Sequence, residues 1–237
     1  VIGAGASGLI AASRAAELGA KVLLLEKMER AGRKLLITGK GRCNITNTLK
    51  QTEYYKHIHP RGRFLKHAFS RFFSEDIIKL LNDYGVETTE ERGGRVFPFS
   101  NHSAEVTKAL IDKAQTHGTN FRFGCRVNRL LNKNNQITGV EIQEDQQTEQ
   151  VVCKSLILCT GGKSYPATGS DGDGYQLSEA IGHSITPVRP ALVPLVTKER
   201  IHEKMKDLIL KNVRAALWVN GKKGKEEFGE MFFTSYG

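Results

Sequence analysis

VIGAGASGLIAASRAAELGAKVLLLE, residues 1–26, carries the pattern from which the fold class follows. Residues 1–2 end a short apolar strand, and residues 7–18 place alanine and leucine at helical spacing. Gly19 ends that helix, and the apolar run at residues 21–26 has the length and composition of a buried strand. Strand, helix and strand in this order form a βαβ unit, so we predict an α/β fold with a parallel sheet in a three-layer arrangement.

Three glycines occupy the turn between the first strand and the helix, at the spacing Gly3-x-Gly5-x-x-Gly8. In a dinucleotide site the first allows the tight turn, the second lets a pyrophosphate approach the backbone, and the third lets helix and strand pack closely. Glu26 ends the second strand, where a carboxylate accepts hydrogen bonds from ribose hydroxyls. We therefore predict a dinucleotide at the helix N-terminus, contacted by Gly3, Gly5, Ala6, Ser7, Gly8, Glu26 and Lys27.

FAD and NAD share the ADP half that this motif binds, and a second glycine-rich region favours FAD. Cys159-Thr160-Gly161-Gly162 resembles the strand end at which flavoproteins with two dinucleotide-binding domains return to FAD, beside its pyrophosphate. Residues 168–174 resemble the Gly-Asp-Gly segment of the succinate dehydrogenase and fumarate reductase group. An ordinary glycine loop is the alternative. The predicted contacts here are Thr160, Gly161, Gly162, Asp173 and Gly174.

A basic segment rich in glycine, GRKLLITGKGRCNITN at residues 32–47, follows the second strand. Its arginine and lysine side chains have the charge to bind phosphates. Its glycines would let the backbone lie against an isoalloxazine ring. A basic surface loop is the alternative interpretation. The predicted contacts here are Arg33, Lys34, Gly41, Arg42, Cys43 and Asn44.

These segments, with ERGGRVFP at residues 91–98, TGGKSYPATGSDGDGY at 160–175 and PALVPL at 190–195, resemble bacterial NAD(P)/FAD-dependent oxidoreductases of the HI0933-like, aminoacetone oxidase-like family. The resemblance covers essentially the whole chain, and GRCN is its most specific part. It implies a Rossmann-type flavoprotein with two dinucleotide-binding domains and a β-rich inserted domain. It also implies that Val127 presents its backbone to adenine, with a core valine as the alternative.

Four cysteines are present, and none are spaced as C-x-x-C. Cys43 either lines the flavin pocket or packs beneath its loop. A second cysteine four or five residues away is missing, so we expect no redox-active disulfide of the glutathione reductase kind. Reduced thiols indicate a cytoplasmic protein. The absence of zinc-ligand spacing gives no support for a metal site.

The remaining pattern predicts two regions. Helices are expected at residues 63–84, 103–117 and 174–182, and strands at 121–130, 137–143 and 151–159, with a turn at 132–135. Beyond Pro187 the chain is rich in proline and strand-like, at 192–197, 208–220 and 227–234, with Asn-Gly at 220–221 as a hairpin turn. We predict an incomplete FAD-binding domain at 1–188 and the first part of the inserted domain at 189–237. We also expect further sequence at both ends.

The net charge of +10 favours polyanionic partners, and no apolar run approaches the ~20 residues of a membrane helix. We predict an FAD-dependent oxidoreductase that transfers hydride at flavin N5, with NAD(P)H as candidate reductant. Family resemblance and charge together suggest reduction of uridine in ribosomal RNA. The alternatives are a small-molecule amine oxidase or enone reductase, and a flavin-binding module with little turnover. The sequence assigns neither a catalytic acid or base nor an oligomeric state.

Overall fold

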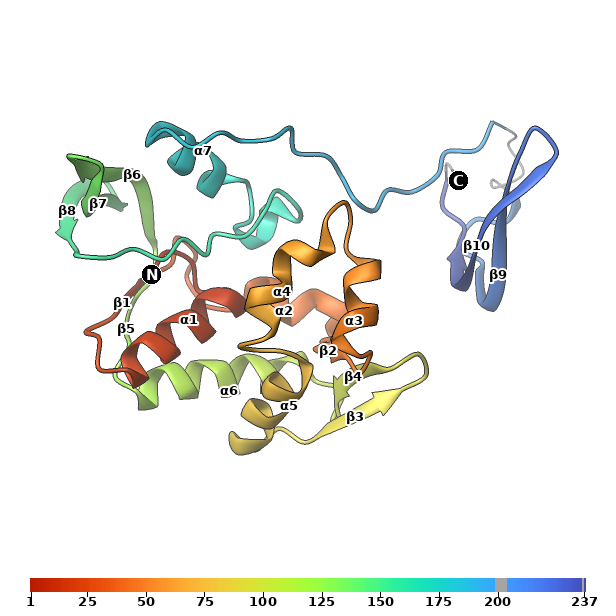
Figure 1. Cartoon of the computed structure of the whole chain (residues 1–237), viewed down its shortest axis with the longest axis horizontal. Coiled ribbons are helices and arrows are strands. Elements are labelled where there is room, and N and C mark those ends of the chain that lie inside the picture. Colours follow the sequence, from red (N-terminus) through yellow and green to blue (C-terminus); the bar gives the residue numbers. More distant parts are fainter. Residues whose placement is uncertain (199–203, 236) are drawn as a thin grey trace. The chain divides into compact units, whose positions relative to one another are not determined.

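The computed structural model describes residues 1–198, 204–235 and 237 (Figure 1). Contacts divide the chain into two units, Val1–Thr186 and Pro187–Gly237, and each is described by itself. The division lies close to the domain boundary predicted between residues 188 and 189. The assignment of these units to an FAD-binding domain and an inserted domain stays a prediction.

A parallel sheet forms the centre of the first unit. Strand β1 (Leu23–Leu25) pairs in parallel with β5 (Asn120–Arg122), and Ile2 forms parallel bridges to the last residue of β1 and to Leu158. Helix α1 (Ala6–Glu17) connects the Ile2 position to β1. The predicted βαβ unit and parallel sheet are therefore confirmed.

Alternate residues of β1 face two hydrophobic clusters, which gives three layers. Leu24 belongs to the cluster formed with helices on one face, and Leu25 to the cluster on the other face. The helices in the first cluster are α1, α5 (Ser74–Asp83) and α6 (Ser103–Thr116). The second cluster includes an antiparallel sheet of β6 (Cys125–Lys133), β7 (Gln136–Glu144) and β8 (Gln147–Val152), together with α7 (Asp173–Ala180). The turn between β6 and β7 has Asn134 and Asn135 at positive φ, as the predicted hairpin requires.

The basic glycine-rich segment forms short elements rather than one loop. Helix α2 (Arg33–Ile37) is followed by the 3-10 helix η1 (Thr38–Gly41) and by β2 (Thr46–Asn47). Strand β4 (Arg95–Pro98) lies between β2 and β3 (Thr88–Glu91) in a small antiparallel sheet. This sheet was not predicted from the sequence, because its strands are short and lack a clear alternation of apolar and polar residues.

The continuous helix predicted at residues 63–84 is wrong. The chain forms α3 (Gln51–Tyr54) and the 3-10 helices η2 (Tyr55–His57) and η3 (Gly62–Leu65), and then α4 (Lys66–Phe69), before α5 begins at Ser74. The break lies at Phe73, whose backbone is extended and whose N–H donates to Asp76 Oδ2 at 2.7 Å. This interaction caps the start of α5, while the aromatic ring of Phe73 packs against Tyr54.

Two further strand predictions need correction. Strand β8 ends at Val152, and the rest of the predicted strand at 151–159 contributes only the bridge at Leu158 to the parallel sheet. In the second unit, residues 192–197 form no strand. This agrees with the presence of Pro194, which has no backbone N–H to donate to a neighbouring strand.

The predicted hairpin of the second unit is confirmed. Strand β9 (Ile209–Val219) pairs antiparallel with β10 (Lys222–Phe232). The turn places Asn220 and Gly221 at φ 50° and 74°, which is the backbone geometry that Asn-Gly favours.

Candidate functional site

The glycine loop lies between Ile2 and α1, and its three glycines have different surroundings. Gly3 has φ 97°, and a Cβ on it would lie 2.5 Å from the carbonyl oxygen of Cys159. A Cβ on Gly8 would lie 1.8 Å from the carbonyl oxygen of Gly3. A Cβ on Gly5 would meet no atom within 4 Å. Gly3 and Gly8 therefore allow close packing of the chain, whereas Gly5 leaves room next to the backbone.

A cavity of about 410 Å³ lies at this loop. Ile2 and Leu25, at the carboxyl ends of two neighbouring parallel strands, border it. Ligands of open α/β sheets bind at this edge. Gly5 caps α1, so the unpaired amides of the first helical turn lie at the same place. An anionic group in the cavity would meet both the amides and the positive end of the helix dipole.

Most of the predicted cofactor contacts come together around this cavity, although they are far apart in sequence. Those that line it are Gly3, Gly5, Ala6, Ser7, Glu26, Lys27, Arg33, Lys34, Asn44, Val127, Thr160, Gly161 and Asp173. Their contact with a cofactor stays a prediction.

The other predicted contacts lie outside the lining: Gly8, Gly41, Arg42, Cys43, Gly162 and Gly174. Gly8 has the packing role given above. A Cβ on Gly174 would lie 2.2 Å from Thr160 Oγ1, so this glycine also allows close packing.

The side chain of Arg42 contacts three other protein side chains. Its guanidinium hydrogen-bonds to Asn101 Oδ1 at 2.6 Å, pairs with Glu91, and lies 4.2 Å from the ring centre of Phe97. These contacts tie the GRCN segment to the small antiparallel sheet.

Glu26 is held at the edge of the cavity by two backbone amides. Its Oε2 accepts a hydrogen bond from the N–H of Ala4 at 2.7 Å, and its Oε1 accepts one from Met28 at 2.9 Å. Each carboxylate oxygen has further acceptor capacity. Glu26 is therefore oriented and still able to accept hydrogen bonds from a ligand.

Besides Lys27, three cations bring positive charge to the cavity wall. Arg33 donates to the carbonyl oxygen of Ala167 at 3.0 Å, and Arg30 and Lys34 also line the cavity. Burial lowers the pKa of Lys34. Within the described parts of the chain, no carboxylate forms an ion pair with Lys34. A partly desolvated ammonium group without a protein counter-ion favours an anionic ligand.

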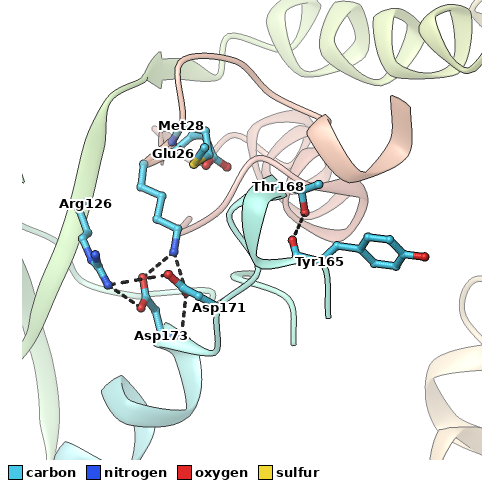
Figure 2. Close-up of polar contacts among 8 residues, drawn as sticks. Glu26, Met28, Arg126, Tyr165, Thr168, Asp171 and Asp173 are labelled. Carbon is cyan, nitrogen blue, oxygen red and sulfur yellow. Dashed lines mark hydrogen bonds and ion pairs between the residues drawn. The ribbon is translucent and has the colours of Figure 1, made fainter. Parts of the chain in front are cut away.

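Lys27, Arg126, Asp171 and Asp173 form an ion cluster that joins three segments distant in sequence. Figure 2 shows Arg126 beside Asp171 and Asp173. Lys27 Nζ lies 2.7 Å from Asp171 and 2.8 Å from Asp173, and Arg126 lies 2.8 Å from Asp173. Burial acts to raise the pKa of Asp171, but hydrogen bonding to Lys27 and its positive charge outweigh this effect and lower the pKa. The cluster fixes the 168–174 segment against the end of β1 and against β6.

All four cysteines are free thiols. Cys43 is fully buried in the helical cluster, and burial raises the pKa of its thiol to about 11. Of its two predicted positions, the structure supports packing beneath the loop. Cys125 and Cys159 line the cavity, and burial raises the pKa of both thiols.

Several lining residues were not predicted from the sequence. Thr168, Gly169 and Ser170 stand inside the glycine-rich segment that was recognised, and their position there was the available signal. The positive charge of Arg30, four residues after Glu26, could have identified it as a lining residue. No sequence pattern identifies Thr38, because it reaches the cavity only through the turn from α2 into η1.

The described residues contain no helix long and apolar enough to cross a membrane. They also contain no group of three His, Cys, Asp or Glu side chains arranged to hold a metal ion.

Known proteins resemble this chain in sequence. It is 33% identical to a 3-dehydro-bile acid delta(4,6)-reductase of Clostridium scindens, matching all of this chain and 56% of that protein. It is 30% identical to a ribosomal RNA dihydrouridine synthase of Escherichia coli, matching all of this chain and 57% of that protein. The chain thus spans a little over half the length of these relatives.

Solved structures share the fold at low identity. A 3-ketosteroid-delta4-(5alpha)-dehydrogenase of Rhodococcus jostii superposes with a TM-score of 0.62 at 16% identity, over 78% of this chain and 53% of that one. A flavocytochrome c3 fumarate reductase gives 0.56 at 19% identity, over 89% of this chain and 46% of that one. The chain therefore shares the fold of these two enzymes. The Rossmann-domain model of the HI0933-like proteins matches residues 1–230, and the chain belongs to this family.

Proposed function

We propose that this chain holds FAD and belongs to an oxidoreductase that reduces a carbon–carbon double bond. The observation that carries the proposal is the glycine-loop cavity, where the Glu26 carboxylate and unpaired helix amides lie along one wall. The open space at Gly5 accommodates the approach of a pyrophosphate to the backbone.

The chemistry of the cavity fits the parts of FAD. The amides at the start of α1, with Arg33 and Lys34, supply donors and positive charge for the diphosphate. Glu26 has acceptor capacity for ribose hydroxyls. Val127 lines the cavity, which supports the proposal that it lies beside the adenine. The cavity residues thereby bind and orient the cofactor, while a bound flavin supplies hydride transfer at its N5.

The names of the two relatives describe the same kind of change. One is a reductase of delta(4,6) bonds in a bile acid, and the other converts uridine in ribosomal RNA to dihydrouridine. In both, a carbon–carbon double bond is saturated. We extend this reaction class to the present protein.

Uridine in ribosomal RNA is the substrate that we propose, with NAD(P)H as reductant, in the cytoplasm. The charge of +10 supports a polyanionic substrate. The similarity to ribosomal RNA dihydrouridine synthases of Escherichia coli and Haemophilus influenzae, at 30% and 29% identity, supports this substrate. A small-molecule enone reductase is the second candidate, favoured by the 33% identity to the bile acid reductase.

The test is a reconstituted reaction. Purified protein should carry FAD, should be reduced by NADH or NADPH, and should then form dihydrouridine in ribosomal RNA transcribed without modifications, as detected by mass spectrometry. Reduction of a steroid enone without any change in RNA would favour the second candidate. Protein that binds FAD but never turns over NAD(P)H would instead be a flavin-binding module, and protein that takes up no FAD would contradict the proposal.

A further inference from the structure

Residues 50–73 form a helical segment between β2 and α5, called here the basic excursion. Its ends are held together, because Thr46 Oγ1 and Ser74 Oγ form a hydrogen bond at 2.8 Å. Asn44, just before β2, lines the cofactor cavity. The basic excursion therefore begins six residues after Asn44, with only the short strand β2 between them.

The basic excursion has an aromatic core of its own. The ring of Tyr54 lies 5.7 Å from Phe69 and 5.2 Å from Phe73, edge to face, and Tyr55 stacks on Phe69 at 5.9 Å. Gly62 is buried against Tyr55, and a Cβ on this glycine would lie 2.1 Å from the Tyr55 carbonyl oxygen. This packing gives the excursion a defined shape, which fixes the side chains on its outside.

The outside of the excursion is cationic and poor in counter-ions. It contains six Lys or Arg residues and a single acidic residue, Glu53, which pairs with Lys56 at 2.7 Å. Across the described parts of the chain, no ion pair joins a carboxylate to the four exposed cations Arg61, Arg63, Lys66 and Arg71. Exposed lysines on the neighbouring helices differ, since Lys79 pairs with Asp83 and Lys108 with Asp112.

Two exposed aromatic residues lie among these cations, and Phe64 is far more exposed than Phe72, which is 38% exposed. Phe64 is 86% exposed, whereas Tyr54, Tyr55, Phe69 and Phe73 are partly buried in the aromatic core. Phe64 lies in η3, which leads without a gap into α4, and Arg63 and Lys66 are three positions apart along these turns. Residues at this spacing are neighbours on a helical surface. The surface therefore combines an accessible ring with adjacent unpaired positive charges.

We propose that the basic excursion is the surface on which single-stranded RNA docks next to the cofactor site. Phosphates would lie on Arg61, Arg63, Lys66 and Arg71, and an unpaired base would stack on Phe64. Single-stranded RNA suits an exposed ring better than duplex RNA, whose base faces are covered. This proposal rests on ribosomal RNA being the substrate.

The test compares charge and ring variants of the FAD-loaded protein. The docking variant is Arg61→Glu/Arg63→Glu/Lys66→Glu. Its matched control, Lys21→Glu/Lys133→Glu/Lys154→Glu, makes the same charge change at exposed lysines outside the excursion. Phe64→Ala removes the displayed ring, and Phe64→Trp keeps an aromatic surface. Binding to ribosomal RNA transcribed in vitro is measured against salt, and flavin content and circular dichroism report folding.

The docking variant should bind RNA about tenfold or more weakly, with a salt slope shallower by about 2, since each lost single-strand phosphate contact removes ~0.7. The control variant should stay within about threefold of the wild type. Phe64→Ala should weaken binding about fivefold or more, and Phe64→Trp should restore it.

Several outcomes would overturn the docking surface. The control variant could lose as much affinity as the docking variant, Phe64→Ala could bind like the wild type, or heparin and anionic vesicles could show the same dependence on Phe64 as RNA. Undiminished dihydrouridine formation by the docking variant would reject the surface and leave the proposed function standing. A wild-type protein that neither binds nor reduces RNA would reject the RNA substrate itself, and the docking surface with it.

Discussion

The carboxylate of Glu26 accepts a hydrogen bond from the backbone N–H of Ala4 at 2.7 Å. The bond joins the residue that follows β1 to the glycine loop, and both residues line the cavity. Because the amide fixes one oxygen of the carboxylate, the side chain is oriented before a ligand arrives. Preorganisation of this kind lowers the entropic cost of binding.

Glu26→Gln should weaken FAD binding by about tenfold to a hundredfold. The substitution keeps the shape but replaces one charged acceptor oxygen with an amide group, which cannot accept, and a hydrogen bond to a charged group contributes ~1.5–3 kcal/mol. Flavin fluorescence titration of the apoprotein measures the effect. Glu90→Gln is the control, because Glu90 is exposed and lies outside the cavity lining. Equal FAD affinity for Glu26→Gln and wild type would contradict the assigned role.

Alanine at two glycines of the same loop should have opposite consequences. Gly5→Ala should fold normally, since the added Cβ meets no atom within 4 Å, yet it should lose FAD affinity because the methyl group enters the space beside the backbone. Gly8→Ala should lower the free energy of unfolding by ~1–3 kcal/mol or more, because its Cβ would overlap the carbonyl oxygen of Gly3. Chemical denaturation and FAD titration separate the two effects. Loss of stability in Gly5→Ala with normal FAD binding would reverse the assignment.

The parts of the fold predicted from sequence depend on local patterns. The glycine spacing, the apolar runs and the Asn-Gly turn each specify a conformation within a few residues, and α1, β1 and the hairpin of β9 and β10 follow them. The break at Phe73 depends instead on an aromatic core whose rings come from both ends of the excursion. A helical pattern in sequence does not reveal such a contact, so the predicted helix ran through it.

The same distinction applies to the candidate site. Gly3, Gly5 and the carboxylate of Glu26 were predicted correctly as part of the site lining, because a dinucleotide motif fixes their spacing. Arg42 was assigned to the phosphate-binding cations from its charge alone. In the structure its guanidinium forms an ion pair with Glu91 and lies over the ring of Phe97. Which cations remain available to a ligand depends on tertiary contacts between distant segments.

The thiol of Cys43 should be inert at about pH 8. Burial excludes reagents and raises its pKa to about 11, so the reactive thiolate is scarce. Mass spectrometry after brief alkylation of the native protein should find Cys153, which is partly exposed, modified before Cys43. Since unfolding lets this thiol ionise at its ordinary pKa, stability should fall as pH rises from about 9 to about 11. Rapid labelling of Cys43 in the folded protein would contradict its burial.

Reduction of the bound flavin should produce no thiolate–flavin charge-transfer absorbance. The four cysteines are free, and the pKa values of Cys125 and Cys159, which line the cavity, are raised rather than lowered. Anaerobic titration with dithionite, followed by visible spectroscopy, is the measurement. A long-wavelength band that disappears in Cys159→Ser would show that a thiolate faces the flavin after all.

Lys27→Met should make the protein less stable at neutral pH and less sensitive to acid. The ammonium group bridges Asp171 and Asp173, and its loss leaves Arg126 as the cation paired with these carboxylates. The free energy of unfolding should fall by about 1–2 kcal/mol, because the cluster is partly exposed.

Lys27 lowers the pKa of Asp171, so its stabilisation is present above the ordinary pKa of an aspartate and is lost as pH falls through the lowered value. The thermal unfolding midpoints of variant and wild type should therefore differ near pH 7, and the difference should shrink as the pH falls below the ordinary aspartate pKa of about 4. Lys79→Met, which removes an exposed helical pair with Asp83, should cost less than about 0.5 kcal/mol. A gap between Lys27→Met and wild type that stays constant from neutral to acid pH would mean that Lys27 stabilises the fold by packing rather than by its charge.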